Sequence, residues 1–174
     1  MDEKLKLAIS ENIKMRGGNN SSFRKNLVEM YFNKGEKLFR YTKWYRLKQV
    51  YKPPHPLGLI SYFFFYVIYR NKFDVKMSDM KIGNGFHIEH DGNVYINAES
   101  IGNHFWIFQG VTIGADKNGG IPTLGDNVTV YTNAVISGDI KIGNNCTIGA
   151  NAFVNRDLPD NSIVINQCSI IKRK

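Results

Sequence analysis

The stretch LGDNVTVYTNAVISGDIKIGNNCTIGANAFV, from Leu124 to Val154, carries an aliphatic residue at every sixth position without a slip. Neither an amphipathic helix, with its period of 3.6 residues, nor a hairpin strand, with its period of two, produces such a run. The aliphatic positions are Leu124, Val130, Ile136, Ile142, Ile148 and Val154. A fixed period of this kind indicates a repeat architecture in which each hexapeptide supplies one short strand.

The same step of six continues towards the N-terminus in two further runs. Its positions there are Ile82, Ile88, Val94, Ile101, Ile107 and Ile113. A small residue often stands four places after the aliphatic one, as at Ala98, Ala134, Cys146 and Ala152. Twelve positions on this period predict four three-sided coils, stacked about 4.8 Å apart with the aliphatic side chains inside.

The regular step is interrupted twice. One extra residue separates Val94 from Ile101, and the ten residues Gly114–Thr123 take the place of the usual five between Ile113 and Leu124. Because this longer segment cannot stay in the coil, residues 114–123 are predicted to form a protruding loop. A loop held by a rigid scaffold is a frequent place for functional residues.

Residues 1–73 differ from the repeat in the spacing of their apolar residues and in their charge. Aromatic and aliphatic residues recur there at helical spacing between glycines and prolines, which predicts an N-terminal α-helical region, with helices starting at Asp2 and Phe23. Residues 1–76 hold 16 Lys and Arg against 6 Asp and Glu, a net charge of +10, whereas residues 77–174 hold 7 against 9, a net charge of −2. A basic region of this kind suits nucleic acid, an anionic membrane or anionic substrates, or is simply a solvated surface.

Three features bear on cellular location. The apolar segment Leu57–Tyr69 has 13 residues, fewer than the roughly 20 that a membrane-spanning helix needs, so we expect a buried aromatic helix, with interfacial membrane contact as the second interpretation. The N-terminus lacks the apolar run of a secretory signal. Cys146 and Cys168 show neither a disulfide framework nor a metal-like pairing. We therefore expect a cytoplasmic protein.

The segments IGNHFWIFQGVTIGA, KIGNNCTIGANAFV and DLPDNS, in this order, resemble the hexapeptide-repeat acyltransferases. They are most similar to the serine acetyltransferases and to the O-acetyltransferases of surface-polysaccharide gene clusters. The resemblance covers residues 74–174 and implies a mainly β fold, a left-handed parallel β-helix, which is the acyltransferase domain. It further implies a homotrimer with active sites between subunits, acetyl-CoA as the acyl donor, and no metal.

His90 matches the place of the catalytic histidine in that family. An acceptor hydroxyl is a poor nucleophile at neutral pH, and a neutral imidazole within hydrogen-bonding distance can take its proton during attack on the thioester. A carboxylate usually orients this histidine. The family's aspartate aligns with Val75, so the neighbouring Asp74 is our candidate, and Asp79 and Asp91 are the alternatives.

The resemblance also predicts residues that contact the substrates. Glu89 stands where the serine enzymes hold the acid that contacts the acceptor amino acid. Gly114 and Ala115, at the start of the loop, match backbone amides close to the thioester, where N–H donors can stabilise a developing oxyanion. The other predicted acetyl-CoA contacts are Thr132, Asn133, Ala150 and Lys172.

Three departures from the family pattern concern the acceptor and the donor. The serine enzymes carry a loop histidine before proline that helps to hold the amino acid, and here that place is Ile121. The family's Gly-Ala-Gly-Ala corner beside CoA begins here with the larger Tyr131. The usual Gly-x-Pro-Ala near the C-terminus is replaced by residues 165–168, INQC.

Our leading interpretation of the sequence is an acetyl-CoA-dependent O-acetyltransferase that acts on a sugar hydroxyl in surface-polysaccharide synthesis, with His90 as general base. The missing loop histidine favours it over the alternative, serine O-acetyltransferase of cysteine biosynthesis. A γ-carbonic-anhydrase-like metalloenzyme is disfavoured, since His87, His90 and His104 lack the spacing of such a zinc site. A non-catalytic scaffold is a further alternative.

The expected partners follow from the same interpretation. They are two further copies of the chain in a homotrimer, acetyl-CoA, and a hydroxyl-bearing small molecule or glycan. The basic, aromatic N-terminal region adds the hypothesis of peripheral contact with the inner membrane face. Nucleic-acid binding would rest on charge alone, without a recognisable motif, and is not expected.

Overall fold

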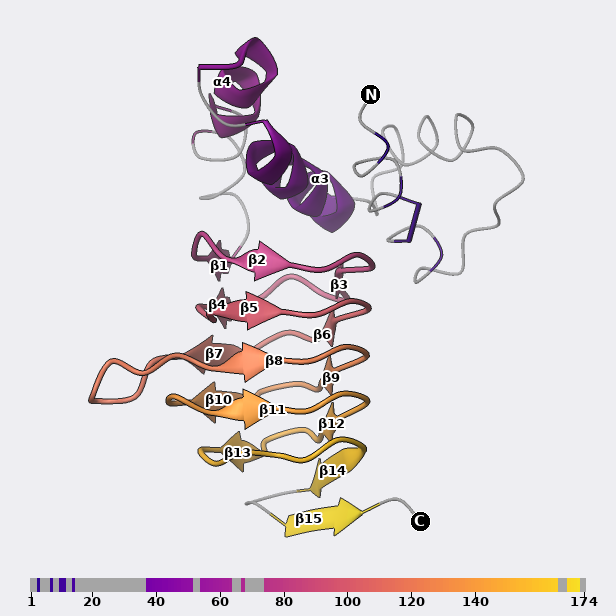
Figure 1. Cartoon of the computed structure of the whole chain (residues 1–174), viewed down its shortest axis with the longest axis vertical. Coiled ribbons are helices and arrows are strands. Elements are labelled where there is room, and N and C mark those ends of the chain that lie inside the picture. The colour runs from indigo at the N-terminus through magenta and orange to yellow at the C-terminus, as the bar shows by residue number, and fades with distance from the viewer. Residues whose placement is uncertain are drawn as a thin grey trace.

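The structure is a computed structural model that describes residues 37–51, 54–63, 74–165 and 169–172, and the single residues 3, 7, 10, 11, 14 and 67. The single residues between 3 and 14 are helical, while the helix predicted from Phe23 lies outside the described residues. Two helices, α3 (Lys37–Val50) and α4 (Pro56–Phe63), precede a long β-helix (Figure 1).

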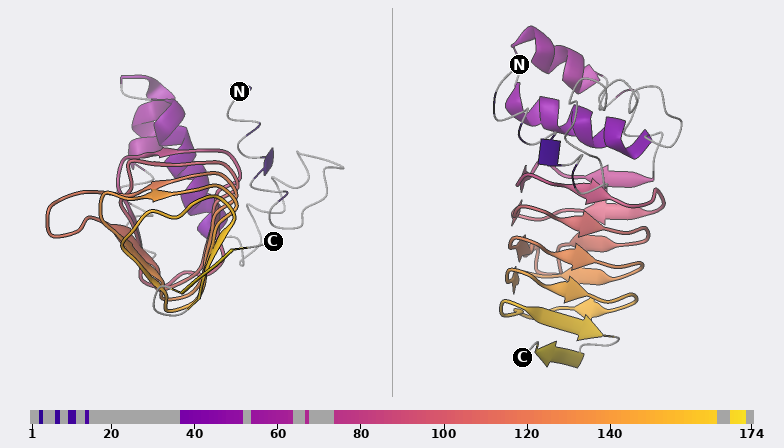
Figure 2. Two further views of the ribbon diagram at one scale, coloured as in Figure 1. Left: turned by 60° about the horizontal axis from the view of Figure 1, so that its bottom comes forward. Right: turned by 90° about the vertical axis from the view of Figure 1, so that its right-hand side faces the viewer.

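Three sheets form the sides of a triangular prism, as Figure 2 shows. The first sheet holds β1 (Val75–Met77), β4 (Val94–Ile96), β7 (Thr112–Gly114), β10 (Val135–Ser137) and β13 (Phe153–Val154). The second sheet holds β2 (Lys81–Ile82), β5 (Ser100–Ile101), β8 (Thr123–Leu124) and β11 (Lys141–Ile142). The third sheet holds β3 (His87–Ile88), β6 (Trp106–Ile107), β9 (Thr129–Val130), β12 (Thr147–Ile148), β14 (Ser162–Ile165) and β15 (Ser169–Lys172).

The coil is left-handed and mainly parallel, which confirms the predicted fold class. In Figure 1 the strands of the second sheet face the viewer and run from left to right while the coil descends, which is the sense of a left-handed helix. Neighbouring coils pair in parallel, and β15 alone among the described strands runs antiparallel, on β14.

The prism has five coils, one more than the sequence predicted, because the first sheet has five strands. The additional coil begins at β1. Met77 pairs with Ile96 in the next coil, but it lies only five residues before Ile82. The step of six therefore does not reach this first coil, which explains why the period alone missed it.

The register also corrects one position of the repeat. Ile96, rather than Val94, continues the aliphatic column of the first sheet, because Ile96 pairs with Ile113. Val94 lies two residues earlier and is also buried. The corner of residues 89–93 thus holds two more residues than the regular step provides, and His90 lies in this enlarged corner.

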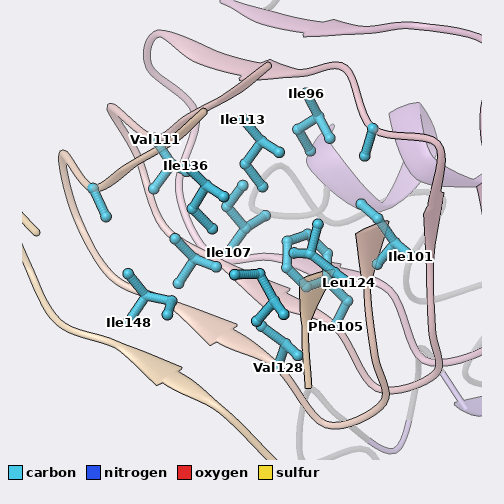
Figure 3. Close-up of a cluster of buried hydrophobic side chains, with 14 of the residues drawn as sticks. Ile96, Ile101, Phe105, Ile107, Val111, Ile113, Leu124, Val128, Ile136 and Ile148 are labelled. Carbon is cyan, nitrogen blue, oxygen red and sulfur yellow. The ribbon is translucent and has the colours of Figure 1, made fainter. Parts of the chain in front are cut away.

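The interior is filled by the aliphatic columns that the period predicted. Figure 3 shows these side chains pointing into the prism, where they are almost completely shielded from solvent. They include Ile107, Ile113, Leu124, Ile136 and Ile148, and Ile96 joins them in place of the predicted Val94. Residues of Val, Leu or Ile size each contribute about 1.5–3 kcal/mol when fully buried, so the stacked columns are the main source of stability.

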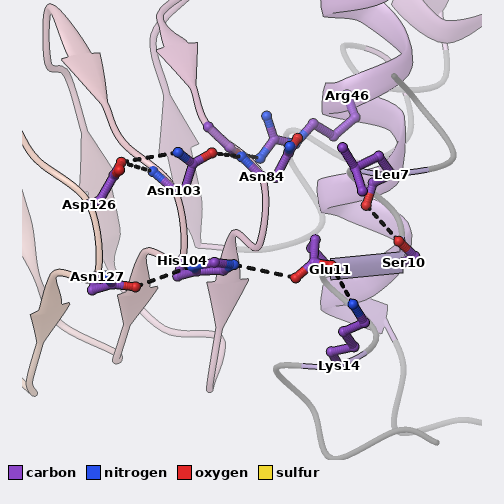
Figure 4. Close-up of polar contacts among 11 residues, drawn as sticks. Leu7, Ser10, Glu11, Lys14, Arg46, Asn84, Asn103, His104, Asp126 and Asn127 are labelled. Atoms are coloured by element: carbon purple, nitrogen blue, oxygen red, sulfur yellow. Dashed lines mark hydrogen bonds and ion pairs between the residues drawn. The ribbon is translucent and has the colours of Figure 1, made fainter. Parts of the chain in front are cut away.

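Asparagines shape two of the three corners. A corner residue must adopt a left-handed backbone conformation, which asparagine tolerates better than most residues. The residues with this conformation are Asn93, His104, Asn127, Asn133, Asn145, Asn151 and Asn161. His104 takes one of these places, and its Nδ1 lies 3.1 Å from Oδ1 of Asn127 in the coil below (Figure 4). His104 is therefore part of a structural column.

The helix α3 closes the N-terminal end of the prism. The first coil has no further coil above it, so its backbone carbonyls would form an open sheet edge, which invites pairing with other chains. Side chains of α3 donate to these carbonyls instead. The donors are Tyr41, Tyr45, Arg46 and Gln49, and the acceptors are the carbonyls of Val75, Ser78, Met80, Ile82 and Gly83.

Tyr45 is the central side chain of this contact. It is completely buried, and its hydroxyl oxygen lies 3.0 Å from the carbonyl oxygen of Ser78 and 3.2 Å from that of Met80. Burial raises the pKa of Tyr45 to about 12, so the hydroxyl keeps its proton and can donate. Tyr41, Trp44 and Tyr45 of this helix are therefore packing residues.

The helix α4 differs from its prediction. The sequence predicted a buried aromatic helix, but most large side chains of α4 are about half exposed, and only Gly58 and Ser61 are buried. The exposed residues are Leu57, Leu59, Ile60, Tyr62 and Phe63. Figure 1 shows α4 beyond α3, on the side away from the β-helix. Of the rest of the predicted segment, up to Tyr69, only Val67 is described, and it is exposed as well.

Candidate active site

One edge of the prism gathers most of the predicted site residues. The edge joins the third sheet to the first, and in successive coils it is formed by residues 89–93, 108–111, 131–134 and 149–152. Backbone hydrogen bonds connect these corners, for example from Gly110 N–H to the carbonyl of Gly92 and from Asn133 N–H to that of Gln109. The predicted residues on this edge are Glu89, His90, Thr132, Asn133 and Ala150.

His90 lies on the surface of this edge, where an acceptor could approach it. Its ring is exposed, and its centroid lies 6.5 Å from that of Phe108 at an interplanar angle of 70°. Within the described part of the chain, His90 has no hydrogen-bond partner. A single chain thus presents the imidazole without the carboxylate partner that catalysis would use.

The three candidate carboxylates lie in different surroundings. The backbone carbonyl of Asp74 accepts a hydrogen bond of 2.7 Å from Val94 N–H, which places Asp74 beside the end of the His90 corner. Its exposed side chain forms no hydrogen bond with His90 among the described contacts. Asp91 is an exposed neighbour of His90. Asp79 is engaged elsewhere, in an ion pair of 2.7 Å with Lys48. The orienting role of Asp74 stays a prediction.

Glu89 is held by two donors that the sequence did not single out. Its Oε2 lies 2.8 Å from His87 Nε2 and accepts a hydrogen bond of 3.1 Å from Trp106 Nε1. Burial alone would raise the pKa of Glu89, but the hydrogen bond and charge of His87, the Trp106 indole and the charge of His90 together lower it. The ionised carboxylate is therefore favoured beside His90.

His87 and Trp106 come from neighbouring coils. We expected His87 to be an ordinary surface residue of a strand, but only 6% of its surface is exposed. It pairs with Trp106 in the parallel register, and their rings meet edge to face with centroids 5.1 Å apart. Because the two residues are 19 positions apart in the chain, only the stacking of coils brings them together.

Aromatic rings continue along the same edge below His90. Phe108 stacks on Tyr131 with centroids 4.8 Å apart and on Trp106 with centroids 6.1 Å apart. Tyr131, which replaces a small residue of the family pattern, therefore lies against Phe108 and remains partly exposed. Thr132, Asn133 and Ala150 follow, half-exposed or exposed.

The protruding loop starts on a different edge, where the first sheet turns to the second (Figure 1). Its base is tied to the next coil: Ser137 Oγ donates to the carbonyl of Ala115 over 3.1 Å, and Gly138 N–H donates to that of Gly114 over 3.2 Å. Its tip is folded by Asp116, whose Oδ1 accepts from two backbone N–H groups of the loop. Within one chain, Gly114 and Ala115 therefore belong to another edge than His90.

A cavity of about 880 Å³ lies between the helices and this second edge. Its lining includes Lys48, Tyr62, Asp79, Asn97, Glu99 and Ile121. Ile121 thus faces the helical region of its own chain. The cavity is separate from the edge that carries His90.

The structure also locates Lys172 and the three histidines that were compared with a zinc site. The backbone of Lys172 lies in β15, in register with Ser162, at the opposite end of the β-helix from the His90 coil (Figure 1); its side chain is outside the described residues. The three histidines weighed as zinc ligands do not converge, since His87 contacts Glu89 and His104 contacts Asn127. Across the described ranges, no three His, Cys, Asp or Glu side chains form a group that could hold a metal ion.

Known proteins similar to this chain are transferases with the same repeat. Residues 122–156 match the family described as bacterial transferase hexapeptide (six repeats). A serine acetyltransferase of Synechococcus elongatus is 40% identical over 89 residues, which cover 49% of this chain and 36% of that protein. A serine acetyltransferase of Staphylococcus aureus is 38% identical over 89 residues, covering 49% of this chain and 42% of that protein. The chain spans less than half the length of these curated relatives.

Solved structures show the same fold over nearly the whole chain. The soybean serine acetyltransferase apoenzyme superimposes with a TM-score of 0.73 at 25% identity, covering 98% of this chain and 70% of that one. The serine acetyltransferase of Neisseria gonorrhoeae superimposes with a TM-score of 0.72 at 24% identity, covering 99% of this chain and 66% of that one.

These relatives overturn our leading interpretation of the sequence, which was a polysaccharide O-acetyltransferase. They are serine acetyltransferases, the stated alternative. The error came from Ile121, because one missing loop histidine was taken to decide the acceptor class. Residues 122–156 thus carry the hexapeptide repeat of bacterial transferases, and the β-helix is similar to that of the serine acetyltransferases.

Proposed function

We propose that this chain is an acetyl-CoA-dependent O-acetyltransferase whose acceptor is the hydroxyl of L-serine. The observation that carries the proposal is the half-buried Glu89 beside the exposed His90, on the enlarged corner of a β-helix that resembles those of serine acetyltransferases. An imidazole on the surface suits a general base, and an ionised carboxylate beside it suits an acceptor that carries an ammonium group.

Each predicted residue then has a distinct task. Acetyl-CoA, when bound, supplies the thioester carbonyl that is attacked. His90 takes the proton of the serine hydroxyl and returns it to the leaving thiol, and Asp74 is proposed to orient its ring. Glu89 holds the acceptor. The N–H groups of Gly114 and Ala115 are proposed to stabilise the charge that develops on the carbonyl oxygen.

The surface below His90 suits an extended donor. Thr132, Asn133 and Ala150 lie in line on the same edge and are accessible, which supports their proposed contact with the arm of acetyl-CoA. Lys172 is retained as a proposed contact for its phosphates, through a basic side chain.

The test is thiol release from acetyl-CoA with L-serine as the acceptor. We expect release that depends on both substrates, and O-acetyl-L-serine as the product detected by mass spectrometry. A panel of sugars and sugar nucleotides serves as the comparison. Release with a sugar but not with serine would contradict the proposed acceptor, while no release with any acceptor would contradict the enzymatic function.

We also propose a homotrimer, because the site is divided in each chain. His90 lies on one edge and the loop residues Gly114 and Ala115 on another, so a complete site needs the loop of a neighbouring copy. Tyr95, Tyr131 and Phe153 expose aromatic surface on the first sheet and its edge, as a subunit interface would. Light scattering after size exclusion is expected to give about 60 kDa, three times the 19.9 kDa of one chain. A mass near 20 kDa would contradict this.

A cytoplasmic location and peripheral contact with the inner membrane face remain proposals. In the part of the chain that the structure describes, no helix is both long and apolar enough to cross a membrane. The support is the exposed apolar surface of α4 within a region of net charge +10, a combination that suits anionic bilayers. We expect sedimentation with anionic vesicles at low salt and release at high salt. Absence of binding at low salt would contradict the membrane proposal.

A further inference from the structure

The contacts around Glu89 leave its two carboxylate oxygens in unequal positions. Oε2 accepts from both His87 and Trp106. Oε1 has no hydrogen-bond partner among the described residues, and 31% of the Glu89 side chain is exposed. One oxygen is therefore anchored to the protein, while the other remains available on the edge that carries His90.

The anchoring donors are themselves fixed by their surroundings. His87 is buried, and its ring lies against the Trp106 indole. Trp106 in turn stacks on Phe108, nearly parallel to it. Glu89 and His87 stand two residues apart on the outer face of the third sheet, and Trp106 is the partner of His87 in the next coil. A carboxylate held by two such donors cannot turn freely.

We propose that His87 and Trp106 are positioning residues that select an acceptor with an ammonium group, by holding Glu89 so that Oε1 faces the acceptor beside His90. This inference rests on the proposed function and deepens it, because it names what distinguishes serine from a neutral hydroxyl compound. A fixed carboxylate oxygen forms a strong charge-assisted hydrogen bond with an ammonium group and a weaker one with a neutral hydroxyl. The Glu89 carboxylate would thereby recognise the acceptor in place of the loop histidine, whose position is held by Ile121 in this chain.

A merely structural role for the same contacts predicts a different outcome. If His87 and Trp106 only stabilise the outer face of the third sheet, their loss should lower stability or affect both substrates alike. A positioning role should change the KM for serine and leave kcat and the KM for acetyl-CoA nearly unchanged, because His90 and the donor site are untouched.

The variants Trp106→Phe and His87→Leu separate these outcomes. Trp106→Phe keeps an aromatic ring for the contacts with His87 and Phe108 but removes the N–H donor. Each variant is expected to raise the KM for L-serine roughly 10-fold, the size of one hydrogen bond to a charged group. His87→Gln keeps a donor of similar reach and should restore most of the affinity. Thr129→Val, next to Trp106 in the outer column, is the matched control and should change nothing.

Pairs of acceptors with and without an ammonium group test this inference separately from the proposed function. Wild type is compared on L-serine against N-acetyl-L-serine, and on ethanolamine against ethylene glycol. If ethanolamine is acetylated and serine is not, the serine proposal fails while the inference stands. Equal use of charged and neutral acceptors, or unchanged KM values in both variants, would overturn the inference. Where no acceptor is acetylated, calorimetry decides it: wild type must bind L-serine more tightly than N-acetyl-L-serine.

Discussion

Replacing His90 with alanine is expected to lower acetyl transfer from acetyl-CoA to L-serine about 10²- to 10⁴-fold, the usual contribution of a general base. The imidazole is exposed on the enlarged corner, next to the carboxylate of Glu89, where an acceptor hydroxyl could approach it. Without it, water would have to take the proton of the serine hydroxyl. Stability should hardly change, because the His90 ring has no hydrogen-bond partner among the described residues and lies outside the core.

Thiol release measures the loss, and thermal unfolding of the same sample checks the fold. His104→Asn is the matched control. His104 is also an exposed histidine at a corner, with a left-handed backbone conformation that asparagine adopts at the same place in the coils below. We expect it to keep wild-type activity. If His104→Asn lost as much activity as His90→Ala, or if His90→Ala remained active, the active site would lie elsewhere.

The fold could be predicted from the sequence because its determinant is local. An aliphatic residue every six positions fills the interior directly, so Leu124–Val154 predicts the prism without any long-range information. Where the chain departs from the step, the prediction failed. Met77 and Ile96 belong to the aliphatic column of the first sheet. Met77 lies five residues before Ile82, so the period of six missed the first coil. Ile96 lies eight residues after Ile88, so the same period selected Val94 instead.

The site could be predicted only in part, since its residues come from different coils and edges. The motif around Glu89 and His90 is contiguous and was found. His87 was judged to be a surface residue, and Trp106 was not considered, because their contact depends on the register between β3 and β6. A signal was nevertheless present: the histidine and the tryptophan lie at equivalent outward positions of adjacent coils, and the acid follows the histidine by two residues. The acceptor was predicted wrongly from one loop position, Ile121.

The second large effect is expected at the N-terminal end of the prism. Tyr45→Ala should lower the free energy of unfolding by about 3–5 kcal/mol, the cost of removing a large buried aromatic side chain. Tyr45→Phe keeps the ring but leaves the carbonyls of Ser78 and Met80 without this donor, and should cost about 1–3 kcal/mol. Leu59→Ala on α4, where the side chain is half exposed, should change stability by no more than about 0.5 kcal/mol.

Chemical denaturation measures these differences, and light scattering tests their consequence. If α3 shields the edge of the first coil, Tyr45→Ala should also associate end to end, because the exposed carbonyls can pair with strands of another molecule. Equal stability of Tyr45→Ala and Leu59→Ala would show that α3 does not rest on the coil as described. The opposite end needs no helix, since β15 folds back on β14. The asymmetry explains why a basic helix precedes the repeat: its tyrosines, arginine and glutamine are the donors that a parallel β-helix lacks at its first coil.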